Sequence, residues 1–395
     1  MKLQSMIRCV ALMVLLAACV WAVPERPGLR YFPDTDAYQT LVCDFHVHTV
    51  FSDGLVWPTV RVEEAWREGL DAIALTDHIE YQPHKEDIPT NHARPFAIAE
   101  SKAKEMNILL IKGSEITKDT PPGHYNAIFI HDIDPIDNKN VLDSVRVASE
   151  QEGFVFWNHH TWKGEDKGKW EDVQTTMFDK QWLHGMEVAN GDTYYPLAHR
   201  WCLDKGMTML GNSDIHQPSY EAQYTPDKHR TLTLVLAKER TVDAVEEAVR
   251  AGRTIVWVGN MLVGRQEYLL PLFEKSVTVR PAYLTTDDAF YFEIVNHAFV
   301  NLELKRTGKV GPAKLTLAKL FLGAHNAKDG GGVINEVLDL NPNIQDAHRV
   351  VRCAAEPAVL WCQHHGGIWR STDEGASWHE LKAEPSSFGF VVAVH

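Results

Sequence analysis

Residues 41–54 read LVCDFHVHTVFSDG, an apolar run that ends in two imidazoles and a carboxylate. In a β-strand, residues two apart point to the same side, so His46 and His48 can hold one metal ion from a rigid backbone. Asp53 follows in a loop whose turn is eased by Gly54. Neutral imidazole suits zinc, iron, manganese or nickel, and a carboxylate widens the choice toward manganese. The stretch therefore predicts a strand that ends in a metal site.

The composition limits the class of partner. A chain of 395 residues is long for one domain, and 45% apolar residues are enough for a sizeable core. Acidic residues outnumber basic ones by 53 to 39, for a formal net charge of −14. Nucleic-acid binders carry a basic face instead, so we expect no nucleic-acid polymer as a partner. A small anionic substrate is compatible with this charge, because bound metal ions supply positive charge locally. The oligomeric state is left open.

Residues 1–22 are predicted to be a signal peptide, because a basic start precedes an apolar core too short to span a membrane comfortably. Cleavage after VWA, at Ala22, fits an ordinary signal peptidase, whereas LAAC, ending at Cys19, resembles a lipoprotein box. Both alternatives stay open, and a buried N-terminal helix is less favoured. Either export route predicts a periplasmic, secreted or lipid-anchored protein, with membrane contact only through a lipid anchor. No CxxC pair occurs in the chain, so a cysteine metal site is not expected.

Seven apolar runs follow one another before residue 217, and amphipathic stretches lie between several of them. The runs are LVCDFHVHT, DAIALTDH, NILLIKGSEI, HYNAIFI, FVFWNHH, GMEVAN and MTMLGNSDIH. The stretches WPTVRVEEAWREGL and RPFAIAESKAKEM have helical spacing. This alternation predicts an α/β fold with a parallel sheet, closed or open. Polar residues at the run ends would gather at the carboxyl edge of a closed barrel, where such barrels keep their chemistry.

Changes in residue composition along the chain suggest several domain boundaries. We predict a barrel domain over residues 23–275, in which TVDAVEEAVRAGRTIVW forms a helix followed by a strand. Residues 276–308 alternate apolar and polar side chains and are expected to form a short antiparallel β section, too short for a whole sandwich. Residues 309–345 would be a junction to a final segment, 346–395.

The final segment contains WRSTDEGASW, which resembles the Asp box of sialidase-like β-propellers. Ser371, Asp373, Gly375 and Trp378 match the motif, whose role in those propellers is structural. About one blade is present, and a propeller needs several blades to close. We therefore expect a partial propeller-like tail.

The ordered histidines and carboxylates resemble the PHP superfamily, named for polymerase and histidinol phosphatase. The matching motifs are D-x-H-x-H-T-x-x-S-D-G, T-D-H, G-x-E, a mid-chain histidine and G-x-S-D-x-H. They cover about residues 41–260. The resemblance implies a distorted seven-stranded (β/α)7 barrel that binds two or three divalent metal ions, which would be manganese, zinc or iron.

The resemblance also implies a ligand for each metal. It assigns the first metal to His46, His48, Glu115 and Asp214. It has Glu115 bridge to a second metal, completed by His124 and His159. It gives the third metal to Asp53, His78 and His216. The family commonly has proline after the fifth-strand histidine, and this chain has His160 there.

Clustered divalent ions lower the pKa of a bound water and stabilise entering and leaving oxygens, which phosphate ester hydrolysis needs. The predicted reaction is attack by a metal-bridging hydroxide on phosphorus, without a protein nucleophile. The sequence has no P-loop, G-x-S-x-G elbow or dinucleotide fingerprint to suggest another mechanism.

Two loops after predicted strands carry candidate substrate contacts. Residues 80–96, EYQPHKEDIPTNHARPF, contain His84 and Arg94, and TWKGEDKGKW, after His160, contains Lys163. Arg94 and Lys163 are predicted to contact phosphate. His160 or His84 is predicted to donate a proton to the leaving group.

The type of ester rests on resemblance alone. The exported character and the first motifs look like the exported phosphodiesterase branch of the superfamily, which favours small phosphodiesters. One alternative is a phosphomonoesterase resembling histidinol or nucleotide phosphatase. An alternative of another class is a carbohydrate-binding, propeller-type protein in which the tail is the active part.

Overall fold

A computed structural model of the chain describes residues 31–221, 228–279, 284–285, 290–291, 294–305, 314–317, 347–352, 360–364, 367–372 and 379–381. The predicted signal peptide and the Asp-box residues Asp373, Gly375 and Trp378 lie outside these ranges. Contacts divide the described residues into two units, one over 34–271 and one made of 31–33 and the residues from Leu272 on. Within the described part, none of the helices has the length and apolar character to cross a membrane.

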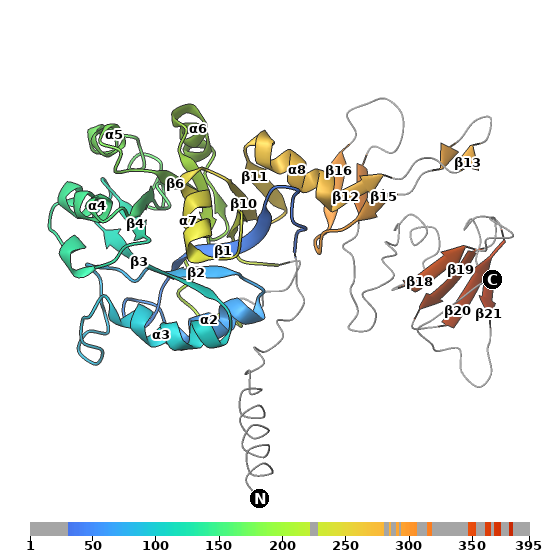
Figure 1. The fold of residues 1–395 in the computed structure, drawn as a ribbon, viewed down its shortest axis with the longest axis horizontal. Coiled ribbons are helices and arrows are strands. Elements are labelled where there is room, and N and C mark those ends of the chain that lie inside the picture. The colour runs from blue at the N-terminus through green and yellow to red at the C-terminus, as the bar shows by residue number, and fades with distance from the viewer. Residues whose placement is uncertain are drawn as a thin grey trace, which may run out of the picture. The chain divides into compact units, whose positions relative to one another are not determined.

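The first unit is built on one curled mixed sheet of 11 strands (Figure 1). The strands are β1 (Gln39–Val47), β2 (Ala72–Leu75), β3 (Leu109–Thr117), β4 (His124–Ile128), β5 (Phe154–Trp157), β6 (Gly185–Asn190), β7 (Thr193–Tyr194), β8 (Thr208–Asn212), β9 (Leu232–Ala237), β10 (Thr254–Val258) and β11 (Met261–Gly264). Their order is β11-β10-β9-β1-β2-β3-β4-β5-β6-β7, and β8 pairs with β6. All seven apolar runs of the sequence form strands, as predicted.

The sheet is mixed, so the prediction of a parallel sheet is wrong in part. The pairs β1–β2, β2–β3, β5–β6 and β6–β8 are parallel, but β4 runs antiparallel to both β3 and β5. Only residues 118–123 connect β3 to β4. A crossover between parallel strands needs about a dozen residues or more, so this connection can make only an antiparallel pair. Strand β9, which the sequence reading did not include, is antiparallel to β1.

The end of β1 meets the segment that follows β8. A parallel bridge joins Val47 and Ile215. The Asp214 amide donates to the His46 carbonyl over 3.0 Å, and the His48 amide donates to the Ile215 carbonyl over 3.2 Å. These bonds bring the first and last of the seven predicted strands together at the edge that carries the candidate ligands.

Helices flank this sheet (Figure 1). They are α2 (Pro58–Arg67), α3 (Arg94–Glu105), η1 (Asp134–Ile136), α4 (Val141–Glu150), α5 (Asp172–Asp179), α6 (Pro196–Lys205) and α7 (Val242–Arg250). Helix α8 (Gln266–Ser276) follows β11 and includes the boundary between the two units. Helix α2 begins with Pro58, which needs no amide partner at that position. Helix α7 begins after Thr241, whose hydroxyl accepts a hydrogen bond from the Ala244 amide over 3.2 Å. Helices α2 and α3 pack side by side.

The alternation of side chains along β1 decides which residues reach the candidate site. Cys43 and Phe45 are fully buried in a hydrophobic cluster with residues of α7 and β9. Successive strand residues point to opposite faces, so Asp44 and His46 face away from that cluster. Alternate side chains of β1 therefore point into the hydrophobic core and toward the candidate metal site.

The second unit contains short antiparallel pairs. They are β12 (Val277–Val279) with β15 (Ile294–Asn296), β13 (Leu284–Thr285) with β14 (Phe290–Tyr291), and β16 (Leu302–Lys305) with β17 (Lys314–Leu317). Strands β18 (Ala347–Arg352), β19 (Leu360–His364), β20 (Gly367–Ser371) and β21 (His379–Leu381) form a four-stranded antiparallel sheet. The interpretation of this sheet as a propeller blade stays a prediction.

Candidate metal centre

The structure brings the nine predicted ligands together at one edge of the sheet. They are His46 in β1, His48 after it, Asp53 in the next loop, His78 after β2, Glu115 in β3, His124 at the start of β4, His159 after β5, and Asp214 and His216 after β8. His124 is the first residue of its strand, whereas the others lie near or beyond strand ends. Because β4 is antiparallel, its first residue lies at the edge where β3 ends.

Four of these side chains converge on one point. His46 Nε2 lies 3.2 Å from Asp214 Oδ1 and 3.4 Å from Glu115 Oε2. His48 Nε2 lies 3.1 Å and 3.4 Å from the same two oxygens. Ligands about 2.1 Å from a tetrahedral metal ion lie about 3.4 Å apart, so these spacings fit one ion. His46 Nε2 and His48 Nε2 are buried and have no hydrogen-bond partner, which an ion between them would provide.

A second set uses the other carboxylate oxygens. Glu115 Oε1 lies 3.0 Å from His124 Nδ1 and 3.4 Å from His159 Nε2. Asp214 Oδ2 lies 3.7 Å from His159 Nε2. Glu115 and Asp214 thus each turn one oxygen toward the first set and the other toward the second. This is the geometry expected of a carboxylate that bridges two ions.

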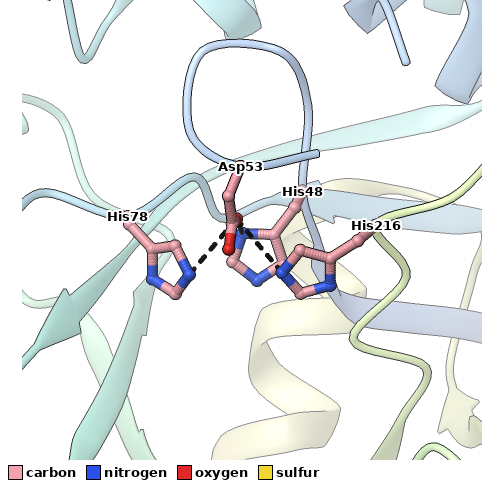
Figure 2. Close-up of side chains that lie close together, drawn as sticks. All are labelled: His48, Asp53, His78 and His216. Atoms are coloured by element: carbon pink, nitrogen blue, oxygen red, sulfur yellow. Dashed lines mark ion pairs between the residues drawn. The ribbon is translucent and has the colours of Figure 1, made fainter. Parts of the chain in front are cut away.

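A third set surrounds Asp53 (Figure 2). Asp53 Oδ1 lies 3.1 Å from His216 Nε2, 3.4 Å from His78 Nε2 and 3.7 Å from His48 Nδ1. The rings of His48 and His216 stack with centroids 4.2 Å apart. Among the residues that the structure describes, these four form one of three groups whose donor atoms lie close enough to share an ion. The other two groups are His46, His48 and Asp214, and His46, Glu115 and His159. The role of each residue as a ligand stays a prediction.

Burial and mutual charge shift the pKa values of these groups in opposite directions. Burial, and next the charge of His78, lower the pKa of His48 to about 3. Burial opposes the charged form of His78 as well, but Glu115 and Asp53 prevail and raise its pKa to about 10. Burial would raise the pKa of Glu115, yet His78 and His46 hold it well below its usual range. Metal ligands must be deprotonated, so a bound ion would replace protons as the positive charge of this cluster.

Glu187 in β6 supports the centre, and sequence reasoning missed it. The side chain is fully buried. Its Oε1 accepts from His46 Nδ1 over 2.8 Å and from Asn212 Nδ2 over 3.0 Å, and its Oε2 accepts from the His159 amide over 2.9 Å. Donation by Nδ1 leaves His46 Nε2 free to bind a metal. A carboxylate inside the apolar run GMEVAN was the available signal.

Asp77 of the T-D-H motif organises the loop that carries Asp53. Its carboxylate accepts from the Thr49 amide over 2.7 Å and from the Ser52 hydroxyl over 2.8 Å. The Ser52 hydroxyl lies 3.2 Å from His48 Nδ1. This motif aspartate therefore positions neighbouring residues of the centre through hydrogen bonds to their loop.

The surroundings of His160 do not fit its predicted role as a proton donor. His160 is 2% exposed, and its Nδ1 donates to the Gly168 carbonyl over 2.7 Å. Its ring packs against Trp157 and Trp201, with centroids 5.6 Å and 5.2 Å away. Burial lowers its pKa, which disfavours the protonated form. His159 lies in the candidate metal centre, whereas His160 holds the loop that follows it through its bond to Gly168.

Two cavities open at the centre. One, of about 430 Å³, is lined by His78, His124, His159, Trp162, Asn190, Thr193, Tyr195, Asp214 and His216. The other, of about 510 Å³, is lined by Asp53, Glu80, Tyr81, Thr117, Lys118, Asp119, His124, Trp162 and Lys163. Trp162 and His124 line both cavities, and Trp162 is 50% exposed.

Of the other predicted substrate residues, only Lys163 reaches these cavities. Its Nζ lies 4.6 Å from the Trp162 ring centroid and 3.9 Å from Asp119 Oδ1. His84 and Arg94 line neither cavity. Arg94 is exposed at the first turn of α3, and His84 is half-buried in the preceding loop. The predictions for His84 and Arg94 therefore have no support in the geometry.

Comparison with known proteins gives a consistent picture. The PHP domain family matches residues 44–194. A crystal structure from Bacteroides vulgatus ATCC 8482, described as a two-domain protein containing a predicted PHP-like metal-dependent phosphoesterase, is 46% identical with a TM-score of 0.70. The match covers 73% of this chain and 86% of that one. An uncharacterized protein of Methanocaldococcus jannaschii is 39% identical over 80 residues, which are 20% of this chain.

The chain spans only 34% of the length of the archaeal relative, so that match concerns a limited segment. The bacterial relative covers most of both chains, and the family match includes the first four ligand motifs. The resemblance drawn from the sequence is confirmed, and the chain belongs to the PHP family.

Proposed function

We propose that this protein hydrolyses phosphate esters at a metal centre and that small phosphodiesters are its substrates. The observation that carries the proposal is the convergence of His46, His48, Glu115 and Asp214, whose donor atoms lie 3.1–3.4 Å apart across the set. Structural likeness to a protein described as a PHP-like metal-dependent phosphoesterase supports the same reaction class.

Divalent ions, when bound, supply an acidified water and positive charge for the phosphoryl oxygens. The residues of the chain hold the rest of the geometry. Glu115 and Asp214 each present one oxygen to each of two neighbouring sets. Lys163 stands at the rim of a cavity that also reaches Asp53 and His124, where its charge attracts an anionic substrate. We propose two or three ions of manganese, iron or zinc, because the donors are imidazoles and carboxylates.

The paired cavities support a diester over a monoester. A phosphodiester carries an organic group on each side of phosphorus, and a monoester carries one. Cavities of about 430 and 510 Å³ adjoin the centre, and Trp162 and His124 line both of them. Each is large enough to hold a small organic group.

The test compares bis(p-nitrophenyl) phosphate with p-nitrophenyl phosphate at saturating Mn²⁺, with Asp214→Ala as the inactive control. We expect kcat/KM for the diester to exceed that for the monoester by at least about tenfold, or ~1.4 kcal/mol. The reverse order would favour the phosphomonoesterase. Turnover of neither ester by a metal-loaded protein would reject the hydrolase.

We also propose that the protein is exported, on the basis of residues 1–22. Fractionation of the producing cells, combined with N-terminal sequencing of the mature chain, distinguishes cleavage after Ala22 from lipidation at Cys19. Full recovery of an uncleaved chain from the cytoplasm would reject export.

A further inference from the structure

Arg61 is a buried arginine on the inner side of α2 that the predicted mechanism does not use. It is 1% exposed, and its five N–H groups all have acceptors. Nε donates to the His48 carbonyl over 2.9 Å, and Nη1 donates to Glu64 Oε2 over 2.7 Å. The remaining three N–H groups donate over 2.7–3.1 Å to the carbonyls of residues 215, 216 and 217. Arg61 therefore ties the end of β1 to the segment after β8.

The two tied segments carry ligands of the set around Asp53. His48 and His216 both offer their carbonyls to Arg61, and their rings stack in the centre. Glu64 extends the same link, because its Oε1 accepts from the Ser219 amide over 2.8 Å. Residues 213–219 lie beyond β8, so the strand ladder ends before most of this segment. Arg61 and Glu64 add hydrogen bonds from a helix to those that the backbone around β1 already makes with residues 214–216.

A lysine at position 61 cannot make the same set of hydrogen bonds as Arg61. A guanidinium presents five donors in a rigid plane, whereas an ammonium has three donors on a flexible stem. A lysine at this position can make at most three of the five hydrogen bonds that Arg61 makes. The carbonyls of residues 215 and 216 keep backbone amides as donors, but the link from α2 to the segment would be weaker and the segment less firmly held.

We propose that Arg61 is a positioning residue that builds the metal position formed by Asp53, His78 and His216 beside His48. This inference rests on the proposed metal centre. The group of His46, Glu115 and His159 accepts no hydrogen bond from Arg61, so it should keep its ion when Arg61 changes. The consequence is a variant that holds fewer ions in an otherwise intact centre.

The test counts ions rather than turnover. Wild-type and Arg61→Lys proteins are stripped, titrated with Mn²⁺ by calorimetry and analysed for metal per chain after dialysis. We expect Arg61→Lys to lose the ion at the Asp53 position, or to bind it at least tenfold more weakly, while the ion held by His46, Glu115 and His159 binds as in the wild type. Excess Mn²⁺ should restore the full ion count.

Arg67→Lys is the matched control. Arg67 lies on the same helix and donates a single hydrogen bond, over 2.7 Å, to the Ser219 hydroxyl of the same segment. We expect it to bind every ion with wild-type affinity. Glu64→Gln keeps the shape of the side chain and should weaken the same ion as Arg61→Lys, by a smaller factor.

Two outcomes would overturn the proposal. One is an Arg61→Lys protein that binds all ions with wild-type affinity. The other is loss of every ion together, with a matching fall in the melting temperature of the stripped protein, which would make Arg61 a general structural residue. A wild type that binds its ions but cleaves no ester would reject the proposed function and leave this inference intact.

Discussion

The candidate centre has two sides that share their chemistry but differ in how the chain holds them. The strand-side group, His46, Glu115 and His159, is buried, and two of its members lie within β-strands. In the loop-side group, His48, Asp53, His78 and His216, the Asp53 side chain is 25% exposed and that of His216 is 30% exposed. The strand-side donors are positioned mainly by the sheet ladder. The loop-side donors depend on Asp77 and Arg61, which bind their loops from outside the group.

This difference indicates that two metal positions with the same types of ligand can differ in their affinity for the ion. A donor on a ladder strand loses little freedom when an ion binds, because the backbone is already fixed. A donor on a loop must be ordered by other side chains, and those contacts can be lost without unfolding the domain. We therefore expect a tight strand-side position and a weaker loop-side position.

The largest effect is expected for Glu115→Gln. One oxygen of Glu115 faces His46 and His48, and the other faces His124 and His159, so the substitution removes a charge from two positions at once. We expect metal retention to fail and hydrolysis to fall by at least about 10³-fold.

Elemental analysis and esterase assays measure both effects of Glu115→Gln. Glu100→Gln, an exposed substitution on α3, serves as the control and should behave as the wild type. A Glu115→Gln protein with full metal content and activity would contradict the assignment of Glu115 as a carboxylate shared by two metal positions.

Graded chelation should separate the two sides. An exposed, loop-held ion exchanges before a buried one, so we expect one ion to leave at low chelator concentration and the others only at high concentration. Exhaustive removal should abolish hydrolysis. It should also lower stability by up to ~4 kcal/mol where metal had been a thousandfold above its Kd. Metal content, activity and melting temperature are followed together, and full activity after complete removal would contradict the account.

Glu187→Gln tests the support of the strand side. The variant keeps the volume of the side chain, but one of its oxygens becomes an amide donor and cannot accept from both His46 and the His159 amide. We expect metal affinity to fall about 10- to 100-fold, as for other residues that orient metal ligands. Calorimetric titration with Mn²⁺ measures this loss. Unchanged affinity would mean that the ladder alone fixes His46.

The smallest effect is expected for Lys163→Gln at the rim. Lys163 is exposed, and an exposed charge contributes ~1 kcal/mol, so KM should rise about fivefold at low salt with kcat nearly unchanged. Lys167→Gln on the same loop is the matched control, because Lys167 is exposed and lines neither cavity. Equal KM values for the two variants would show that Lys163 does not contribute to substrate binding.

The local pattern of the sequence was enough for much of the fold and for the types of ligand. The two-residue period of β1 separates Cys43 and Phe45 from the histidines, and this period is readable without coordinates. The seven strands were predictable for the same reason, since each is a short apolar run with polar ends. Signals of this kind depend only on neighbours in the chain.

The remaining features needed the tertiary structure, because they depend on residues far apart in sequence. The reversed direction of β4 brings His124 to Glu115, and the motif spacing alone did not show this. His160 carries the same side chain as His159, yet packing against Trp157 and Trp201 turns it away from the centre.

By itself the sequence determined that imidazoles and carboxylates would meet at strand ends, since periodicity and spacing are local properties, and their order resembled the PHP family. Only the tertiary structure decided how those groups are held. Glu187 lies 141 residues from His46, and Arg61 lies 155 residues from His216. Neither contact has a local signature, because a hydrogen bond forms wherever folding places a donor beside an acceptor, whatever their separation along the chain.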